Sequence, residues 1–406
     1  MSFMTGFSGL YIHIPFCLRK CAYCDFVSLA GHQAWHAVYV QALCHEAERR
    51  AGGWDQACFD SVFFGGGTPT VLPSGALISV LDTCRRHLHL VEGAEITLEA
   101  NPGTVDTAAL CALREAGANR LSLGMQSLHD DELSLLGRIH KASEAIRAYH
   151  MTREAGFTNV NLDLMFGLPG QRLERWRETL QQALGLKPEH LSLYALAVEP
   201  DTPLAVSVAA GLVPSPDDDL AAEMYELAET MLAEEGYVHY EISNWARMLA
   251  PDTTARREPA LLPGTEESLA YACRHNLKYW RNERYLGLGL AAASYDGYGR
   301  GANTTDLASY VASLNSGEDP ILGSMETCDE ARRMDETMML GIRLIAGISW
   351  ESFRYRFGVD PRVVYNSQIT ELMGDGLLQA DDLSLRLTPR GRLLGNRVFA
   401  AFLRTP

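Results

Sequence analysis

The sequence lacks long hydrophobic runs, an excess of positive charge and the pattern of a secreted disulfide protein. No segment approaches the roughly eighteen consecutive apolar residues that a membrane-spanning helix needs. Lys and Arg number 35 against 51 Asp and Glu, which gives a net charge of −16. A clustered basic surface for a nucleic-acid backbone is therefore not expected, and a DNA-binding regulator is disfavoured. Attachment to a membrane surface stays an alternative.

The N-terminus and the cysteines indicate a reducing compartment. Residues Met1 to Ser8 lack both the basic region and the apolar core of a secretory signal. Nine cysteines in such a chain indicate reduced thiols rather than a disulfide framework. We therefore expect a cytoplasmic protein. Its 406 residues suffice for two or three domains, and 47% hydrophobic residues is ordinary for a globular chain.

Short β-rich runs alternate with helical stretches through the first 240 residues. Six such βα units predict an α/β fold with a parallel sheet covered by helices, either a curved barrel or an open doubly wound sheet. The expected strands are Leu10–Ile14, Ser61–Phe64, Glu95–Glu99, Arg120–Leu123, Asn159–Met165 and His190–Ala195. The expected helices are Trp35–Arg50, Ala76–Leu88, Ala108–Ala116, Ser143–Ala155, Leu173–Leu184 and Asp219–Glu235.

Polar and glycine-rich residues favour the barrel, because they follow the C-terminal ends of these strands. Barrel enzymes build their sites on that face. In chain order these residues are Cys17 to Cys24, Gly65 to Pro69, Glu99 to Pro102, Gly124 to Ser127, Asp163 with Gly167 to Gly170, and Ala197.

The pattern changes after Tyr237. Met248 to Glu267 carries three prolines and little periodicity, which indicates an inserted loop. Thr327 to Leu403 returns to helical spacing and ends in short β-rich runs, which predicts a small α+β, winged-helix-like domain. We expect a partial barrel over residues 1–240, an extension over 241–325 and the C-terminal domain over 326–406.

The run Cys17-Leu18-Arg19-Lys20-Cys21-Ala22-Tyr23-Cys24 has the spacing C-x3-C-x2-C. Thiolates are the ligands that an iron–sulfur cluster requires, and three of them leave one iron open. Three buried thiols, or a zinc site that lacks a ligand, are the alternatives. The remaining cysteines are isolated and are expected to be structural: Cys44, Cys58, Cys84, Cys111, Cys273 and Cys328.

The run Tyr11-Ile12-His13-Ile14-Pro15-Phe16-Cys17, followed by these cysteines, resembles the radical S-adenosylmethionine (SAM) superfamily and its HemN/HemW branch. The resemblance implies a partial (βα)6 radical SAM barrel with a HemN-type C-terminal domain. It also implies a [4Fe-4S] cluster on Cys17, Cys21 and Cys24 whose open iron binds SAM. In the superfamily an electron, from a reductant such as flavodoxin or ferredoxin, then breaks the S–C5′ bond to give a 5′-deoxyadenosyl radical.

The resemblance also implies a set of SAM contacts. Gly65 to Thr70 resembles the GGGTPT motif, where glycines let the backbone approach the methionine part of SAM. Glu99 would accept bonds from the ribose, Arg138 would pair with the carboxylate, and Tyr23 would lie near adenine. Taken singly, a carboxylate or Gln at a strand end is as often a loop cap. The full set is Tyr11, Tyr23, Gly66, Gly67, Thr68, Glu99, Gln126, Arg138, Asp163 and Ala197.

Two kinds of protein in this branch compete. HemN-type enzymes are oxygen-independent coproporphyrinogen III dehydrogenases with a fourth cysteine two positions after the third and a long preceding segment. Here that position is Phe26, and only sixteen residues precede Cys17. HemW-type proteins are haem chaperones with an H-N-x-x-Y-W run, found here as His275-Asn276-Leu277-Lys278-Tyr279-Trp280.

We therefore expect a haem chaperone that delivers haem to recipient haemoproteins, with a radical SAM enzyme acting on a porphyrinoid as the alternative. Haem would contact His275, Asn276, Tyr279 and Trp280, because His is a common axial ligand and aromatic rings offer flat apolar surface. A histidine among aromatics is also often a packed structural residue. Two features depart from the family: the insertion at 248–272, and Ala293 in place of an expected His.

Overall fold

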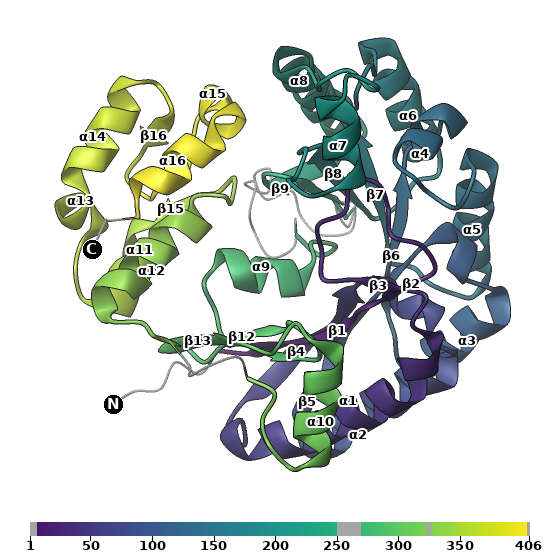
Figure 1. The fold of residues 1–406 in the computed structure, drawn as a ribbon. Coiled ribbons are helices and arrows are strands. Elements are labelled where there is room, and N and C mark those ends of the chain that lie inside the picture. Colours follow the sequence, from purple (N-terminus) through teal and green to yellow (C-terminus); the bar gives the residue numbers. More distant parts are fainter. Residues whose placement is uncertain (1–5, 250–268, 322–325, 404–406) are drawn as a thin grey trace, which may run out of the picture.

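The computed structural model describes residues 6–249, 269–321 and 326–403, and its centre is one curved twelve-stranded sheet (Figure 1). All six expected strands are confirmed, and each pairs in parallel with the next. They are β1 (Ser8–Ile14), β4 (Cys58–Gly66), β5 (His89–Ala100), β6 (Arg120–Gln126), β7 (Val160–Phe166) and β8 (His190–Ala195).

The two faces of these strands differ in chemistry, because side chains alternate along a strand. One face carries Leu10, Ile12, Leu121 and Leu123, which are buried in the main hydrophobic core beneath the helices. The opposite face lines the barrel interior with polar and aromatic groups. Its members include Tyr11, Ser61, Glu95, Glu99, Ser122, Asn161, Asp163 and His190.

The helices expected between the strands are also confirmed, and Figure 1 shows them around the outer side of the sheet. They are α1 (His36–Arg50), α2 (Ser74–His87), α3 (Thr107–Glu115), α5 (Ala142–Glu154), α6 (Leu173–Gly185) and α8 (Asp218–Glu234). Two short helices were not expected from the sequence, α4 (Asp130–Leu135) and α7 (Pro203–Ala209). Both lie in loops at the C-terminal ends of strands.

The sheet extends beyond the six expected strands at both edges. Beside β1 lies β11 (Tyr285–Leu288), also parallel, followed by the antiparallel strands β12 (Ala293–Tyr295), β13 (Gly299–Ala302) and β14 (Glu326–Thr327). Beside β8 lie the antiparallel β10 (Asn244–Arg247) and β9 (Tyr237–Glu241). A separate pair, β2 (Phe16–Cys17) with β3 (Leu29–Ala30), closes the base of the cysteine loop.

Two further helices belong to this part of the chain. Helix α9 (Arg274–Trp280) carries the H-N-x-x-Y-W run, and Figure 1 shows it on the inner, concave side of the sheet. Helix α10 (Leu307–Asn315) packs into the main core beside α1. Most of the expected insertion, residues 250–268, lies outside the described residues.

The C-terminal part has its own hydrophobic core, built around Trp350, Phe353 and Phe402. The expected short β-ribbon is confirmed as β16 (Leu378–Ala380) and β17 (Ser384–Leu387), joined by β15 (Ile348–Ser349). Its helices are α11 (Glu330–Gly341), α12 (Trp350–Phe357), α13 (Pro361–Val364), α14 (Asn366–Gly374), α15 (Pro389–Leu393) and α16 (Gly395–Ala401). Within the described ranges, no helix combines the length and apolar character needed to cross a membrane.

Candidate cluster and cofactor pocket

The three clustered cysteines lie in the loop that follows β1, at the C-terminal end of the barrel. One residue between Cys21 and Cys24 fixes the loop from two sides. The Ala22 N–H donates to the Leu136 carbonyl at 3.0 Å, and the Ala22 carbonyl accepts from the Leu204 N–H at 2.8 Å. Backbone bonds to two different segments therefore hold the middle of this loop in place.

The thiols of the cysteine loop are partly buried. Burial raises the pKa of the Cys17 and Cys24 thiols, so a metal must displace their protons. Throughout the described part of the chain, no three His, Cys, Asp or Glu side chains converge on a point that could hold a metal ion. A structural zinc site brings four donors onto one ion. The described residues therefore do not present the four convergent donors of a structural zinc site at these cysteines.

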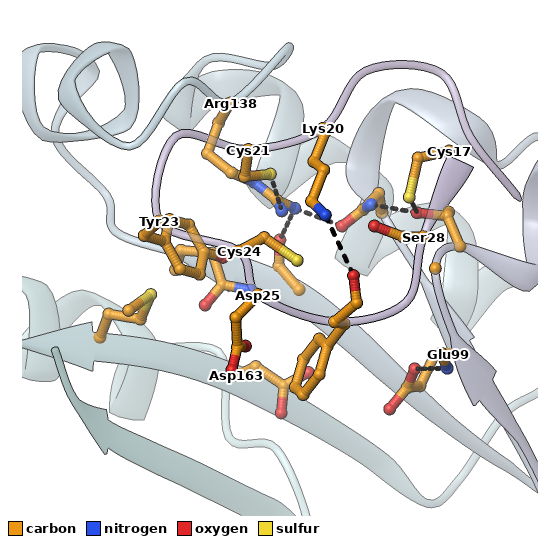
Figure 2. Close-up of a pocket in the computed structure, with 18 of the residues that line it drawn as sticks. Cys17, Lys20, Cys21, Tyr23, Cys24, Asp25, Ser28, Glu99, Arg138 and Asp163 are labelled. Atoms are coloured by element: carbon orange, nitrogen blue, oxygen red, sulfur yellow. Dashed lines mark hydrogen bonds between the residues drawn. The ribbon is translucent and has the colours of Figure 1, made fainter. Parts of the chain in front are cut away.

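A cavity of about 510 Å³ opens directly beside the cysteines, within the roughly 300–1,000 Å³ range of ligand pockets. The structure brings the three cysteines together with all of the predicted SAM contacts except Tyr11, as Figure 2 shows for the labelled ones. The predicted residues that line the cavity are Cys17, Cys21, Cys24, Tyr23, Gly66, Gly67, Thr68, Glu99, Gln126, Arg138, Asp163 and Ala197.

The glycine-rich turn after β4 needs its glycines for steric reasons. Gly66 has a φ of +109°, and a Cβ there would lie 2.4 Å from the His13 ring. A Cβ on Gly67 would lie 2.7 Å from the Phe16 carbonyl oxygen. The turn therefore packs against the cysteine loop with no room for side chains. Its Gly66 N–H donates to Glu99 at 3.1 Å, which joins the turn to the pocket wall.

Two carboxyl groups make the inner wall of the pocket acidic. Burial, and then the nearby Asp163, raise the pKa of Glu99 to about 8. Burial also raises the pKa of Asp163, although Ser122 and Asn161 donate to it at 2.9 and 2.8 Å. Such a wall destabilises its own negative charge and favours a cationic ligand. The sulfonium group of SAM has that charge.

Arg138 reaches the pocket from the loop between α4 and α5. Its Nη2 donates to the Gly124 carbonyl at 2.7 Å and to the Asn101 side-chain oxygen. Its Nη1 donates to Cys21 Sγ at 3.3 Å. The guanidinium thus contacts a cysteine, whereas the sequence predicted a contact with the carboxylate of SAM.

Tyr11 lies deeper in the barrel than the pocket. Its hydroxyl and the His13 Nδ1 are 3.0 Å apart, and the His13 Nε2 is 2.9 Å from the Val27 carbonyl in the cysteine loop. Because a carbonyl only accepts, Nε2 carries the proton and Nδ1 accepts from the Tyr11 hydroxyl. Tyr11 therefore acts on the cysteine loop through His13.

The H-N-x-x-Y-W run lies at the opposite end of the barrel from the cysteines. The His275 side chain is 2% exposed and stacks on Phe63 and Tyr11 with ring centroids 5.4 and 6.3 Å apart. Its Nδ1 is 3.1 Å from the Ser61 hydroxyl, and its Nε2 is 3.0 Å from the Tyr279 hydroxyl. Burial, and then Lys278, lower the pKa of His275 to about 3, so the imidazole is neutral.

Asn276 contacts β9 and Trp280 contacts the C-terminal domain, and neither lines the pocket. The Asn276 side-chain nitrogen donates to the buried Glu241 at 3.3 Å. The Arg343 guanidinium lies 4.5 Å from the centroid of the Trp280 ring. It also lies 4.5 Å from the centroid of the Phe399 ring. The structure therefore does not bring the four predicted haem contacts into the pocket that holds the cysteines.

A buried polar chain that sequence reasoning missed joins the two ends of the barrel. Asn161 donates to Asp163 and accepts from the His190 Nδ1 at 2.6 Å. The His190 Nε2 is 2.8 Å from the Tyr240 hydroxyl, and that hydroxyl accepts from the Cys273 N–H at 3.3 Å. Polar residues at every second position of β7 and β8 were the available signal.

Comparison with known proteins locates two families in the chain. Residues 11–183 match the family model described as the radical SAM superfamily, and residues 329–394 match the HemN C-terminal domain. The chain is 36% identical to "Heme chaperone HemW" of Bacillus subtilis, with 97% of this chain and 98% of the relative covered.

Two further similarities extend this result. The chain is 33% identical to "Radical S-adenosyl methionine domain-containing protein 1, mitochondrial" of Mus musculus, with 95% of this chain and 84% of the relative covered. The solved structure of the coproporphyrinogen III oxidase HemN from Escherichia coli superposes with a TM-score of 0.81, at 24% identity, over 98% of this chain and 90% of that chain. At that identity the superposition shows the fold alone.

Proposed function

Because the chain belongs to the radical SAM superfamily and, within its HemN/HemW branch, to the HemW family, we propose that it binds haem and passes it to recipient haemoproteins. The observation that carries the proposal is the full-length similarity to proteins named as haem chaperones, at 32–36% identity in several bacteria. A [4Fe-4S] cluster and SAM are the proposed resident cofactors, and the predicted cytoplasmic location stays a prediction.

The pocket supports the proposed cofactors through the chemistry of its residues. Cys17, Cys21 and Cys24 would hold the cluster, which when bound supplies single electrons and one open coordination site. The glycine-rich turn offers backbone groups to an amino acid, and Glu99 offers a carboxylate to ribose hydroxyls. The acidic inner wall attracts a sulfonium cation.

The haem ligand predicted from the sequence stays a prediction. Both ring nitrogens of His275 have a hydroxyl partner in this structure, Ser61 at Nδ1 and Tyr279 at Nε2. Ligation by His275 therefore requires one of these contacts to break and the imidazole to leave its 2% exposed position.

The proposal is tested on protein reconstituted anaerobically with iron and sulfide. We expect about four irons per chain and haem binding near one to one. Changing Cys17, Cys21 and Cys24 together to serine should abolish the cluster, whereas the matched change Cys111→Ser on α3 should leave it intact. Absence of haem binding by the cluster-loaded wild-type protein would contradict the chaperone proposal.

The alternative is a radical SAM enzyme that acts on a porphyrinoid, such as a coproporphyrinogen III dehydrogenase. The fold it shares with HemN and the cavity beside the cysteines favour this second candidate. Phe26, which is 65% exposed at the position of the fourth HemN cysteine, disfavours it. Incubation of the reconstituted protein with SAM, reductant and coproporphyrinogen III distinguishes the chaperone from the dehydrogenase. Formation of protoporphyrinogen would show dehydrogenase activity and would contradict the chaperone proposal.

A further inference from the structure

We propose that Arg138 is a positioning residue for Cys21 that raises the reduction potential of the cluster by donating an N–H···S hydrogen bond to the cysteine sulfur. This inference rests on the proposed cluster and goes beyond it, because it concerns how easily the cluster accepts an electron. The observation behind it is the 3.3 Å distance from Arg138 Nη1 to Cys21 Sγ.

The local backbone delivers Arg138 to this position. Helix α4 ends in a Schellman motif, in which the Gly137 N–H donates to Ser134 and the Arg138 N–H donates to Leu133, at 3.0 and 2.9 Å. Gly137 adopts a φ of +72°, and a Cβ there would lie 3.0 Å from the Ala22 nitrogen. The helix end is thus packed directly against the residue that follows Cys21.

Three acceptors from different elements fix the guanidinium plane. The Asn101 side chain follows β5, the Gly124 carbonyl belongs to β6, and the Cys21 sulfur belongs to the cysteine loop. Figure 2 shows the Arg138 side chain beside Cys21, with the contact between them dashed. A planar fork can satisfy three such acceptors at once, and a lysine ammonium on a flexible stem cannot reproduce that geometry. The contacts with Asn101 and Gly124 therefore fix the orientation in which Nη1 points at the Cys21 sulfur.

The chemical consequence follows from the charge of the cluster. Reduction adds one electron to the cluster and its thiolates, so the reduced form gains more from a nearby cation and from hydrogen bonds to sulfur. A guanidinium that donates to Cys21 stabilises the reduced form relative to the oxidised form. Loss of that bond makes the cluster harder to reduce.

Another role for Arg138 is the pairing with the SAM carboxylate that the sequence predicted. The two roles differ when SAM is left out. A residue that acts only on SAM has no effect on the potential of the SAM-free cluster, whereas a donor to Cys21 has its full effect there. The test is therefore a redox titration without SAM, in which electron paramagnetic resonance measures the amount of reduced cluster at each potential.

We compare wild-type protein with Arg138→Met, which removes both the donor and the charge. At the wild-type midpoint potential we expect the ratio of reduced to oxidised cluster to fall about tenfold, which corresponds to about 59 mV for a one-electron couple. The control is Arg19→Gln, which removes an exposed positive charge from the same loop. Its ratio should change twofold or less.

The possible outcomes separate the explanations. An unchanged potential in Arg138→Met with weakened SAM binding would overturn the inference, and so would an equal shift in Arg19→Gln. If Arg138→Met assembles no cluster, Asn101→Ala decides: it keeps Arg138 but removes one acceptor, and a smaller shift in the same direction supports the inference while no shift overturns it. Failure of the wild-type protein to assemble a cluster would instead reject the proposed function, and this inference with it.

Discussion

His275 offers the sharpest prediction, because a packing role and a haem-ligand role require different things of the same ring. Two substitutions separate them. His275→Ala removes the ring, whereas His275→Phe keeps a flat ring of similar size but no nitrogen. We therefore compare the two variants first as apoproteins and then with haem.

The structure sets the expected size of the effect on stability. The ring is 2% exposed and is in contact with Phe63, Tyr11 and Tyr279. Loss of a buried aromatic side chain to Ala costs about 3–5 kcal/mol, and we expect about 4 kcal/mol for His275→Ala. In His275→Phe the packing remains, but the Ser61 and Tyr279 hydroxyls each lose a partner, at about 1–3 kcal/mol per group. We expect about 2 kcal/mol for that variant, the lower end of the sum for the two groups.

The assay is equilibrium urea unfolding of the apoprotein under anaerobic conditions, followed by circular dichroism. His150→Ala, on the exposed face of α5, is the control and should change the free energy of unfolding by less than about 0.5 kcal/mol. Haem titration then separates the two roles. If His275 is the haem ligand, both variants lose the spectrum of ligated haem. If His275 has only a packing role, His275→Phe keeps the wild-type haem spectrum. If both variants are as stable as the control, the reasoning from burial is refuted.

Two other predictions follow from the pocket. The affinity for SAM should rise as the pH increases toward 8, because the pKa of Glu99 is raised to about 8 and only its ionised form attracts the sulfonium and fully accepts from the ribose. Below pH 8 the affinity should fall by at most about tenfold per pH unit, and Glu99→Gln should remove the dependence in equilibrium dialysis. Gly137→Ala should cost about 1–2 kcal/mol, since a non-glycine residue at φ +72° is strained, and it should lower the iron content of reconstituted protein. Unchanged iron would contradict the close packing against Ala22.

Much of the fold could be predicted from the sequence because it follows from local periodicity. Strands such as Leu10–Ile14 and helices such as Leu173–Leu184 were found where the apolar pattern placed them. The extra strands at the sheet edges could not be found this way. β11 pairs in parallel with β1 across more than 270 residues of chain, from Gly9 to Tyr285, and short antiparallel strands such as Ala293–Tyr295 carry little periodic signal.

The pocket was predictable for a different reason. Parallel strands bring their C-terminal ends to one edge, so residues such as Cys21, Glu99 and Asp163 had to gather there once the strands were assigned. The partners of each side chain were not predictable. Whether Arg138 faces a bound carboxylate or the sulfur of Cys21 depends on a few ångströms in a loop, and the sequence does not encode that distance in any pattern.

The H-N-x-x-Y-W run predicts a function but not the contacts that its residues make in the fold. The motif is consistent with a haem site, yet α9 sits over the N-terminal ends of β1 and β4, where Glu95 accepts from the His275 N–H at 3.3 Å and Asp60 pairs with Lys278 at 2.8 Å. With the two ring bonds of His275 and the Asn276 bond to Glu241, these make five contacts that must be retained or replaced for the imidazole to reach a haem iron. Because a buried polar group that loses its partner costs about 1–3 kcal/mol, such a movement needs compensation from the ligand itself, and haem binding should therefore depend on the stability of α9 as well as on the identity of residue 275.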